Sequence, residues 1–179
     1  MINSYQLLVA EMSVEKLIAK LYESMMYRPT GVYVIYRNPN DPEFLVAQSA
    51  RPGHTDWFFP QGGIEEGESL EDNMYRESEE ELEHDFHGKL INIKPFIHYG
   101  ELDAKNGCSF KLRDGFTKGK AYLFSAAEYV GNGHFDANGD ELDSYKWVKH
   151  AEALKIFQKN RSEKKDMLIA AMELAILYI

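Results

Sequence analysis

Residues 57–83 constrain the fold and chemistry of this chain more than any other stretch. They begin Trp-Phe-Phe-Pro-Gln-Gly-Gly and continue to a third glycine, Gly67, which predicts a tight loop. Ser69 is a favourable helix N-cap and Asp72 stands at the N3 position of a capping box, so a helix is predicted to begin at Leu70. One stripe of this helix is predicted to face the core: Leu70, Met74, Ser78 and Leu82.

The same helix carries several carboxylates. At about 100° per residue, Glu77 and Glu81 lie about 40° apart, and Glu80 lies roughly 60° to one side. Carboxylates that converge beside a glycine loop repel one another unless hard divalent cations lie among them. Most glutamate-rich helices are instead solvated surfaces with i,i+4 ion pairs, here Arg76 with Glu80. Taken alone, the sequence of this helix favours a solvated surface over a metal site.

Six positions with fixed spacing overturn that preference. The segment matches G-x5-E-x7-R-E-x2-E-E at Gly62, Glu68, Arg76, Glu77, Glu80 and Glu81. It resembles the Nudix box of the pyrophosphohydrolases. Ser78 stands where the box usually has a large aliphatic residue, and Glu83 and His84 stand where it usually closes with Gly and an aliphatic residue. These are packing and helix-ending positions, so the departures concern the end of the helix more than its chemistry.

The resemblance extends over roughly residues 28–165. Arg28-Pro29 and the Trp57–Gly63 segment are similar to bacterial RNA 5′-pyrophosphohydrolases and the related dinucleoside polyphosphate hydrolases. Glu141, ahead of an aromatic-rich segment, resembles the glutamate outside the box that supplies a further metal ligand in those families. The resemblance implies an α/β/α sandwich with a mixed sheet, and the order of strands, helix, strands and closing helix predicts the same class.

Hydrophobic periodicity and turn residues predict the remaining elements. Ser13 can cap an amphipathic helix that ends before Pro29. We interpret residues 1–28 as an N-terminal helical extension that packs either on the domain or on a second subunit as a homodimer, and residues 29–179 as the Nudix domain. The predicted strands are 31–37 and 44–46 (a hairpin), 57–59, 90–98, 120–129 and 145–148, with a weak hairpin or long loop over 100–119. Ile91, Ile93 and Pro95 are predicted to share one face of their strand. The predicted late helices are 151–158 and 162–178.

Composition limits the possible classes. The 179 residues are 44% hydrophobic and include one cysteine, Cys108, which indicates a single globular domain without an intrachain disulfide in a reducing compartment. No apolar stretch approaches the roughly 18 residues of a membrane span, so we expect a cytoplasmic protein without membrane contact. The net charge of −9 argues against an extended nucleic-acid surface. It does not exclude a phosphate substrate, because bound metals supply positive charge locally.

The resemblance implies a hydrolase that uses Mg²⁺ or Mn²⁺ while water attacks a phosphoanhydride in line. Its implied metal ligands are Glu77, Glu80, Glu81, Glu141 and the carbonyl of Gly62 or Gly63. Either Glu77 or Glu141 could serve as the base, and Arg76 holds Glu80 in place. Glu68, in the first turn of the helix, is expected to orient the loop or helix rather than bind metal.

Substrate contacts are less specific in the sequence. The candidates for stacking on a base are Trp57, Tyr122 and Phe124, although aromatic residues on short strands are more often core. The candidates for contacting outer phosphates are Arg51, Lys118 and Lys120, which could equally be ordinary surface charges.

The favoured substrates are RNA 5′-triphosphate ends or dinucleoside polyphosphates. The charge of −9 makes a small nucleotide (a nucleoside triphosphate, a nucleotide sugar or ADP-ribose) a competing possibility. A Nudix-like module that binds nucleotides without turnover is a third, suggested by Ser78, Glu83 and the extra helix. Glu77, Glu80 and Glu81 favour the enzyme, because a binding module has no need of mutually repelling carboxylates.

Overall fold

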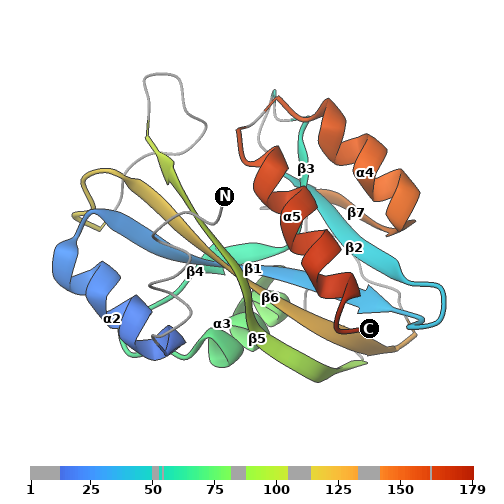
Figure 1. Ribbon diagram of the computed structural model, residues 1–179, viewed down its shortest axis with the longest axis horizontal. Helices are drawn as coiled ribbons and strands as arrows, with labels where there is room; N and C mark the ends of the chain where they lie inside the picture. Colours follow the sequence, from blue (N-terminus) through green and yellow to red (C-terminus); the bar gives the residue numbers. More distant parts are fainter. Residues whose placement is uncertain are drawn as a thin grey trace.

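The computed structural model describes residues 13–49, 53, 55–81, 88–104, 114–132, 142–161 and 163–179. A seven-stranded mixed sheet has the order β3-β2-β1-β6-β5, with β4 paired to β1 and β7 paired to β2. Helices α2 and α3 cover one face, and α4 and α5 cover the other (Figure 1). This arrangement confirms the predicted α/β/α class with a mixed sheet and a helix before the first strand.

The element bounds mostly follow the sequence pattern. The strands are β1 (Tyr27–Arg37), β2 (Glu43–Ser49), β3 (Trp57–Phe58), β4 (Gln61–Gly63), β5 (Gly88–Asp103), β6 (Gly119–Gly131) and β7 (Leu142–Lys149). The helices are α2 (Val14–Ser24), α3 (Leu70–Glu81), α4 (His150–Lys159) and α5 (Lys165–Ile176). Several strands are longer than predicted, because partners distant in the sequence extend them. Tyr27, for example, pairs with Gly119 at the start of a parallel β1–β6 ladder.

Both faces of the central strands are buried. Alternate residues of β1 enter two clusters, with Tyr33 and Ile35 beneath α2 and α3, and Val32 and Val34 beneath α4 and α5. This double burial explains why residues 32–36 of β1 are continuously apolar rather than alternating with polar residues. The predicted β1–β2 hairpin is confirmed, with Tyr36 opposite Phe44.

Strand β5 departs from the prediction. Its register against β6 shifts twice, and Asn92 at the first shift has a φ of 51°. The shifts break the alternation of side chains, so the prediction that Ile91, Ile93 and Pro95 share one face is wrong. Ile91 is exposed while Ile93 packs against the core. The strand also continues to Asp103, into the stretch predicted to be a hairpin or loop, and residues 105–113 of that stretch lie outside the described residues.

Helix α2 begins where the sequence predicts. The Ser13 side chain accepts a hydrogen bond from the Lys16 main-chain N–H at 3.4 Å, as expected of an N-cap. Its inner side is buried against the same sheet through Leu17, Ile18 and Leu21. In the described part of the chain, no helix has the length and apolarity needed to cross a membrane.

Candidate functional site

The glycines that precede α3 form a strand rather than only a loop. Gly62 and Gly63 of β4 pair with Gly31 and Thr30 of β1. A Cβ atom on Gly62 would collide with the carboxyl group of Glu77. The Glu77 carboxylate therefore lies directly against the glycine main chain, and only glycine leaves room for it.

The start of α3 places the carboxylates. The Asp72 main-chain N–H donates to Ser69 Oγ at 3.0 Å, and the Ser69 hydroxyl donates to the Asp72 carboxylate at 2.7 Å, so the predicted cap is confirmed. Leu70, Met74 and Ser78 are buried as predicted, while Leu82 lies outside the described residues. This burial turns Glu77 toward β4 and leaves the Glu80 side chain 59% exposed.

Arg76 connects the carboxylates to the loop. Its guanidinium forms two bonds with Glu68, at 2.8 and 3.0 Å, and donates to Glu77 Oε1 at 2.9 Å. The predicted contact with Glu80 is present but longer, at 3.3 Å. Arg76 also donates to the Gly63 carbonyl at 2.9 Å. The bidentate partner of Arg76 is therefore Glu68, which the i,i+4 rule could not identify because it lies eight residues earlier.

Glu68 is surrounded by donors. Besides Arg76, its carboxylate accepts from the Glu65 main-chain N–H and from the Asn73 amide, both at 2.9 Å. Burial raises the pKa of the Glu68 carboxyl, but hydrogen bonds from Arg76, Glu65 and Asn73 outweigh this effect and hold the pKa below its ordinary value. Glu68 is thus an ionised anchor for the loop, with its oxygens already engaged by the protein.

Asn73 is a site residue that the sequence analysis missed. It is fully buried, and its amide nitrogen donates to the Gly63 carbonyl at 2.8 Å as well as to Glu68. Its side-chain oxygen accepts a hydrogen bond from the Tyr33 hydroxyl. These partners belong to β4, the loop and β1, so no local pattern around Asn73 predicts them.

Several predicted site residues lie beyond what the structure describes. Arg51 and Glu141 are outside the described residues, as is the side chain of Glu81. Within the described residues, no three His, Cys, Asp or Glu side chains gather closely enough to hold a metal. The structure does bring together five predicted site residues: Gly62, Gly63, Glu68, Arg76 and Glu77.

The aromatic candidates differ in accessibility. Trp57 is half-buried, with Lys146 Nζ 4.8 Å from its ring centroid. Its main chain is held on both sides by Asn160, which accepts from Trp57 N–H at 3.1 Å and donates to its carbonyl at 2.6 Å. Tyr122 is 2% exposed and Phe124 is fully buried in the cluster beneath α4 and α5. A base could therefore stack on Tyr122 or Phe124 only after a rearrangement.

Two basic residues that the sequence analysis did not propose as phosphate contacts, Arg28 and Lys164, approach the glycine strand. Arg28 forms an ion pair with Asp114 at 3.1 Å, and its guanidinium lies where a Cβ atom on Gly63 would be. Lys164 donates to Gln61 Oε1 at 2.7 Å. Of the predicted lysines, Lys118 precedes β6 with its Nζ 5.4 Å from the Tyr27 ring centroid, and Lys120 lies opposite Arg28 in the β1–β6 ladder.

Residues 27–169 match the NUDIX domain model. This chain belongs to the NUDIX family. The RNA pyrophosphohydrolase of Shewanella loihica is 31% identical over 113 residues, which cover 59% of this chain and 62% of that protein. The NUDIX chain described here thus spans less than two thirds of the length of that relative.

Solved structures show the same NUDIX fold. The dihydroneopterin triphosphate pyrophosphohydrolase of E. coli superposes with a TM-score of 0.61 at 19% identity, covering 86% of this chain and 99% of that one. The C. elegans Ap4A hydrolase in a binary complex gives a TM-score of 0.55 at 18% identity, covering 85% and 99%. At these identities the likeness concerns the fold.

NUDIX domains generally use divalent metals, and two carboxylates of the described residues, Glu77 and Glu80, offer donor atoms of the kind such a metal binds. The Glu77 carboxylate occupies the space that a side chain at position 62 would fill, so its oxygens lie beside the main chain of β4. Glu80 adds a second carboxylate on the exposed side. Carboxylate and carbonyl oxygens are the ligands that Mg²⁺ and Mn²⁺ prefer.

Proposed function

We propose that this protein is a metal-dependent pyrophosphohydrolase that cleaves a phosphoanhydride in a nucleoside-diphosphate-linked substrate. The observation that carries the proposal is the position of the Glu77 carboxylate, packed against Gly62 and held by Arg76, in a NUDIX chain. Burying a carboxylate requires a compensating partner, which Arg76 provides here. Such pairs occur in functional sites and in structural ion pairs alike, and membership of the NUDIX family favours the functional site.

The proposed metal ligands are Glu77, Glu80, Glu81, Glu141 and the Gly62 carbonyl. When bound, a divalent cation neutralises phosphate oxygens and lowers the pKa of a bound water. The protein supplies the geometry: Arg76 holds Glu77 and Glu68 at fixed positions, and Glu68 orients the loop. Glu77 and Glu141 remain the two candidates for the base that accepts the proton of the attacking water.

The favoured substrates are RNA 5′-triphosphate ends or dinucleoside polyphosphates. Supporting observations are the Shewanella loihica relative named RNA pyrophosphohydrolase and the Arg28-Pro29 and Trp57–Gly63 segments. Arg28 and Lys164 place positive charge near β4, where a short phosphate chain would bind. Arg51, Trp57, Lys118, Lys120 and Tyr122 remain the sequence-based candidates for substrate contact.

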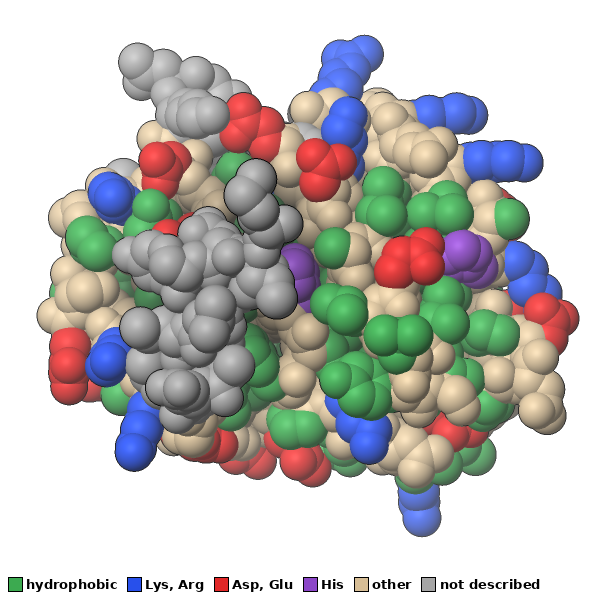
Figure 2. Space-filling view, in the orientation of Figure 1, with side chains coloured by type: hydrophobic (Ala, Val, Ile, Leu, Met, Phe, Trp, Pro, Cys, Tyr) green, Lys and Arg blue, Asp and Glu red, His purple; other side chains and the backbone are tan. Residues whose placement is uncertain are grey.

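The charge of the protein favours a short phosphate substrate over a long RNA backbone. The protein carries a net charge of −9, and on the face shown in Figure 2 the basic side chains do not form a continuous stripe. A long RNA backbone requires such a stripe. We therefore propose that recognition involves only the first one or two nucleotides and their phosphates.

The test is a substrate panel with Mg²⁺ and Mn²⁺ across a salt series. The panel contains a triphosphorylated dinucleotide, a triphosphorylated 20-mer, diadenosine tetraphosphate and a nucleoside triphosphate, with Glu77→Gln as the inactive control. We expect the dinucleotide and the 20-mer to be cleaved at similar rates at every salt concentration. A large advantage of the 20-mer that disappears at high salt would refute the short-substrate proposal. Cleavage of none of the four compounds would exclude the favoured substrates, and binding without turnover would indicate the non-catalytic module.

A further inference from the structure

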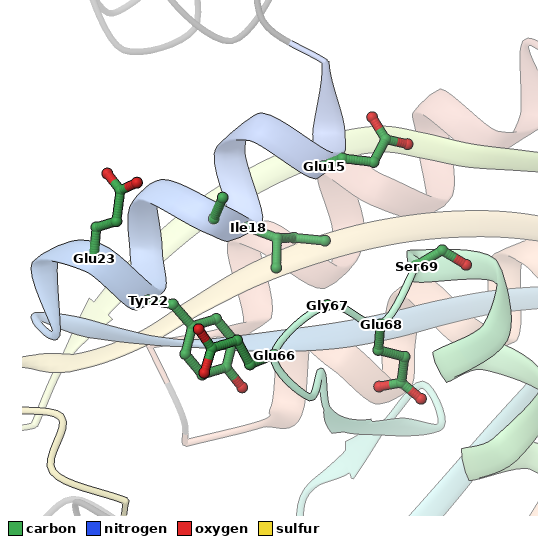
Figure 3. Close-up of a pocket in the computed structure, with 9 residues that line it drawn as sticks. Glu15, Ile18, Tyr22, Glu23, Glu66, Gly67, Glu68 and Ser69 are labelled. Atoms are coloured by element: carbon green, nitrogen blue, oxygen red, sulfur yellow. The ribbon is translucent and has the colours of Figure 1, made fainter.

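Helix α2 packs in the same buried cluster as Ile64 of the NUDIX box loop, and one of its side chains also forms a hydrogen bond with that loop. The Tyr22 hydroxyl donates a hydrogen bond to the Ile64 carbonyl at 2.6 Å. Elsewhere a cleft of about 420 Å³ separates α2 from the loop, with Glu15, Ile18 and Glu23 on one side and residues 66–69 on the other (Figure 3). Within the described residues, Tyr22 is therefore the hydrogen-bonded connection between α2 and this loop. The helix precedes residues 27–169, which match the family model.

The peptide group that Tyr22 contacts is tied at both ends. The Ile64 carbonyl and the Glu65 N–H belong to one planar peptide unit. Its carbonyl accepts from Tyr22, and its N–H donates to Glu68 Oε2 at 2.9 Å. The preceding peptide is also held, because the Ile64 N–H donates to the Pro29 carbonyl at 3.1 Å. The backbone orientation at Ile64 is thus set from β1, from Glu68 and from α2.

A short series of contacts leads from this peptide to the carboxylates. Glu68 accepts from Glu65 N–H and forms the bidentate pair with Arg76. Arg76 in turn donates to Glu77 and to the Gly63 carbonyl. A rotation of the peptide between Ile64 and Glu65 would therefore disturb the group that holds Glu77 against β4.

Tyr22 is well placed to hold the loop still. Its ring packs edge-on against Phe116, with centroids 5.5 Å apart. Beyond the helix, the carbonyls of Met25 and Met26 accept from the main chain of Thr117 and Lys118, at 3.0 and 2.8 Å. Burial raises the pKa of the Tyr22 phenol, opposed by the charge of Arg28, so the hydroxyl remains a donor at neutral pH.

We propose that Tyr22 is a positioning residue that holds the loop of the NUDIX box in the geometry required for metal binding. This inference rests on the proposed function. The hydrogen bond of Tyr22 goes to the Ile64 carbonyl rather than to a proposed metal ligand, so Tyr22 acts through the 64–65 peptide, Glu68 and Arg76. In this way the helix outside the family match contributes to the site.

The test compares Tyr22→Phe with the matched control Tyr75→Phe. Tyr75 also donates its hydroxyl to a main-chain carbonyl, that of Leu90 at 3.2 Å, but this partner belongs to β5 rather than to the loop. In Tyr22→Phe, hydrogen exchange of the amides at 64–68 should accelerate by about fivefold, the scale of one lost hydrogen bond. The Mn²⁺ concentration for half-saturation, measured by direct binding, should rise about tenfold. The catalytic rate should fall while KM stays within about twofold of the wild-type value. Tyr75→Phe should change none of these quantities.

The possible outcomes separate this inference from the proposed function. Equal loop exchange and equal Mn²⁺ affinity in the two variants would overturn the positioning role. If the wild-type protein cleaves no compound of the panel, the proposed function fails, while loop exchange and Mn²⁺ binding still support or overturn the role of Tyr22. A similar loss of thermal stability in both variants, with loop effects only in Tyr22→Phe, would support it.

Discussion

Ser78→Ala should stabilise the protein. Ser78 lies on the inner stripe of α3, is fully buried, and its Oγ has no hydrogen-bond partner within the described residues. A buried hydroxyl without a partner has lost its hydrogen bonds to water, and no protein group replaces them. The residue also stands at the box position that usually carries a large aliphatic side chain.

The expected gain follows from two effects. An unsatisfied buried hydroxyl costs about 1–3 kcal/mol, and replacing serine by alanine inside a helix contributes roughly another 0.5 kcal/mol. Loss of the packing contacts of Oγ offsets part of this gain. We expect a net increase of about 1–2 kcal/mol in the free energy of unfolding, which corresponds to a rise in Tm of about 4 °C for a domain of this size.

Urea denaturation and calorimetry would measure the change, and an exposed neighbour provides the control. Glu79 lies next to Ser78 on the solvent side of α3, so the difference between Glu79→Ala and Glu79→Ser isolates helix propensity. The increase in the free energy of unfolding of Ser78→Ala must exceed that difference. Turnover should be unaffected, because the Ser78 side chain faces the core. A gain no larger than the control difference, or a loss, would show that the hydroxyl is satisfied in the folded protein and refute the reasoning.

Three further predictions concern the carboxylates. Glu80→Gln should abolish turnover at saturating metal, because the substitution removes the charge of a proposed ligand. Stability should stay equal or rise, because Glu80 is exposed and the substitution relieves repulsion between carboxylates. Near-normal turnover would contradict the ligand role. Glu141→Ala should lower the catalytic rate by at least about tenfold, with Asp140→Ala and Asp143→Ala as parallel controls; a loss in a neighbour alone would move the role along the chain. The pKa of Glu68 lies below its ordinary value near 4.5, so its contribution to stability is present above that value and is lost as pH falls through the folded pKa. Glu68→Gln should therefore destabilise the protein at pH 7, with the gap narrowing in acid; a pH-independent difference between the unfolding curves would count against the charged anchor.

Local signals in the sequence determined much of the fold. The caps at Ser13 and Ser69 predicted the starts of α2 and α3, because capping involves residues within one turn. The spacing of the NUDIX box predicted the family for the same reason: its residues lie on one loop and one helix. The turn before β2 and the apolar runs predicted the hairpin and the central strands.

The sequence was less informative where partners come from distant segments. The three-residue strand β4 was predicted as loop, because its pairing with β1 joins residues about thirty positions apart. The face assignment of Ile91 was wrong, because the register of β5 is set by β6 rather than by alternation. Tyr122, which the sequence made a candidate for stacking on a base, is buried by helices that come later in the chain.

The same distinction applies to the site. Sequence spacing named Glu68, Arg76 and Glu77, but only the packing of the loop against α3 decided that Arg76 pairs bidentately with Glu68. The contact of Tyr22 with Ile64 spans 42 positions along the chain. A sequence specifies which donors and acceptors exist and how neighbours within a turn interact. Which distant groups meet depends on how the helices pack on the sheet, because a hydrogen bond requires its atoms to lie within about 3 Å of each other.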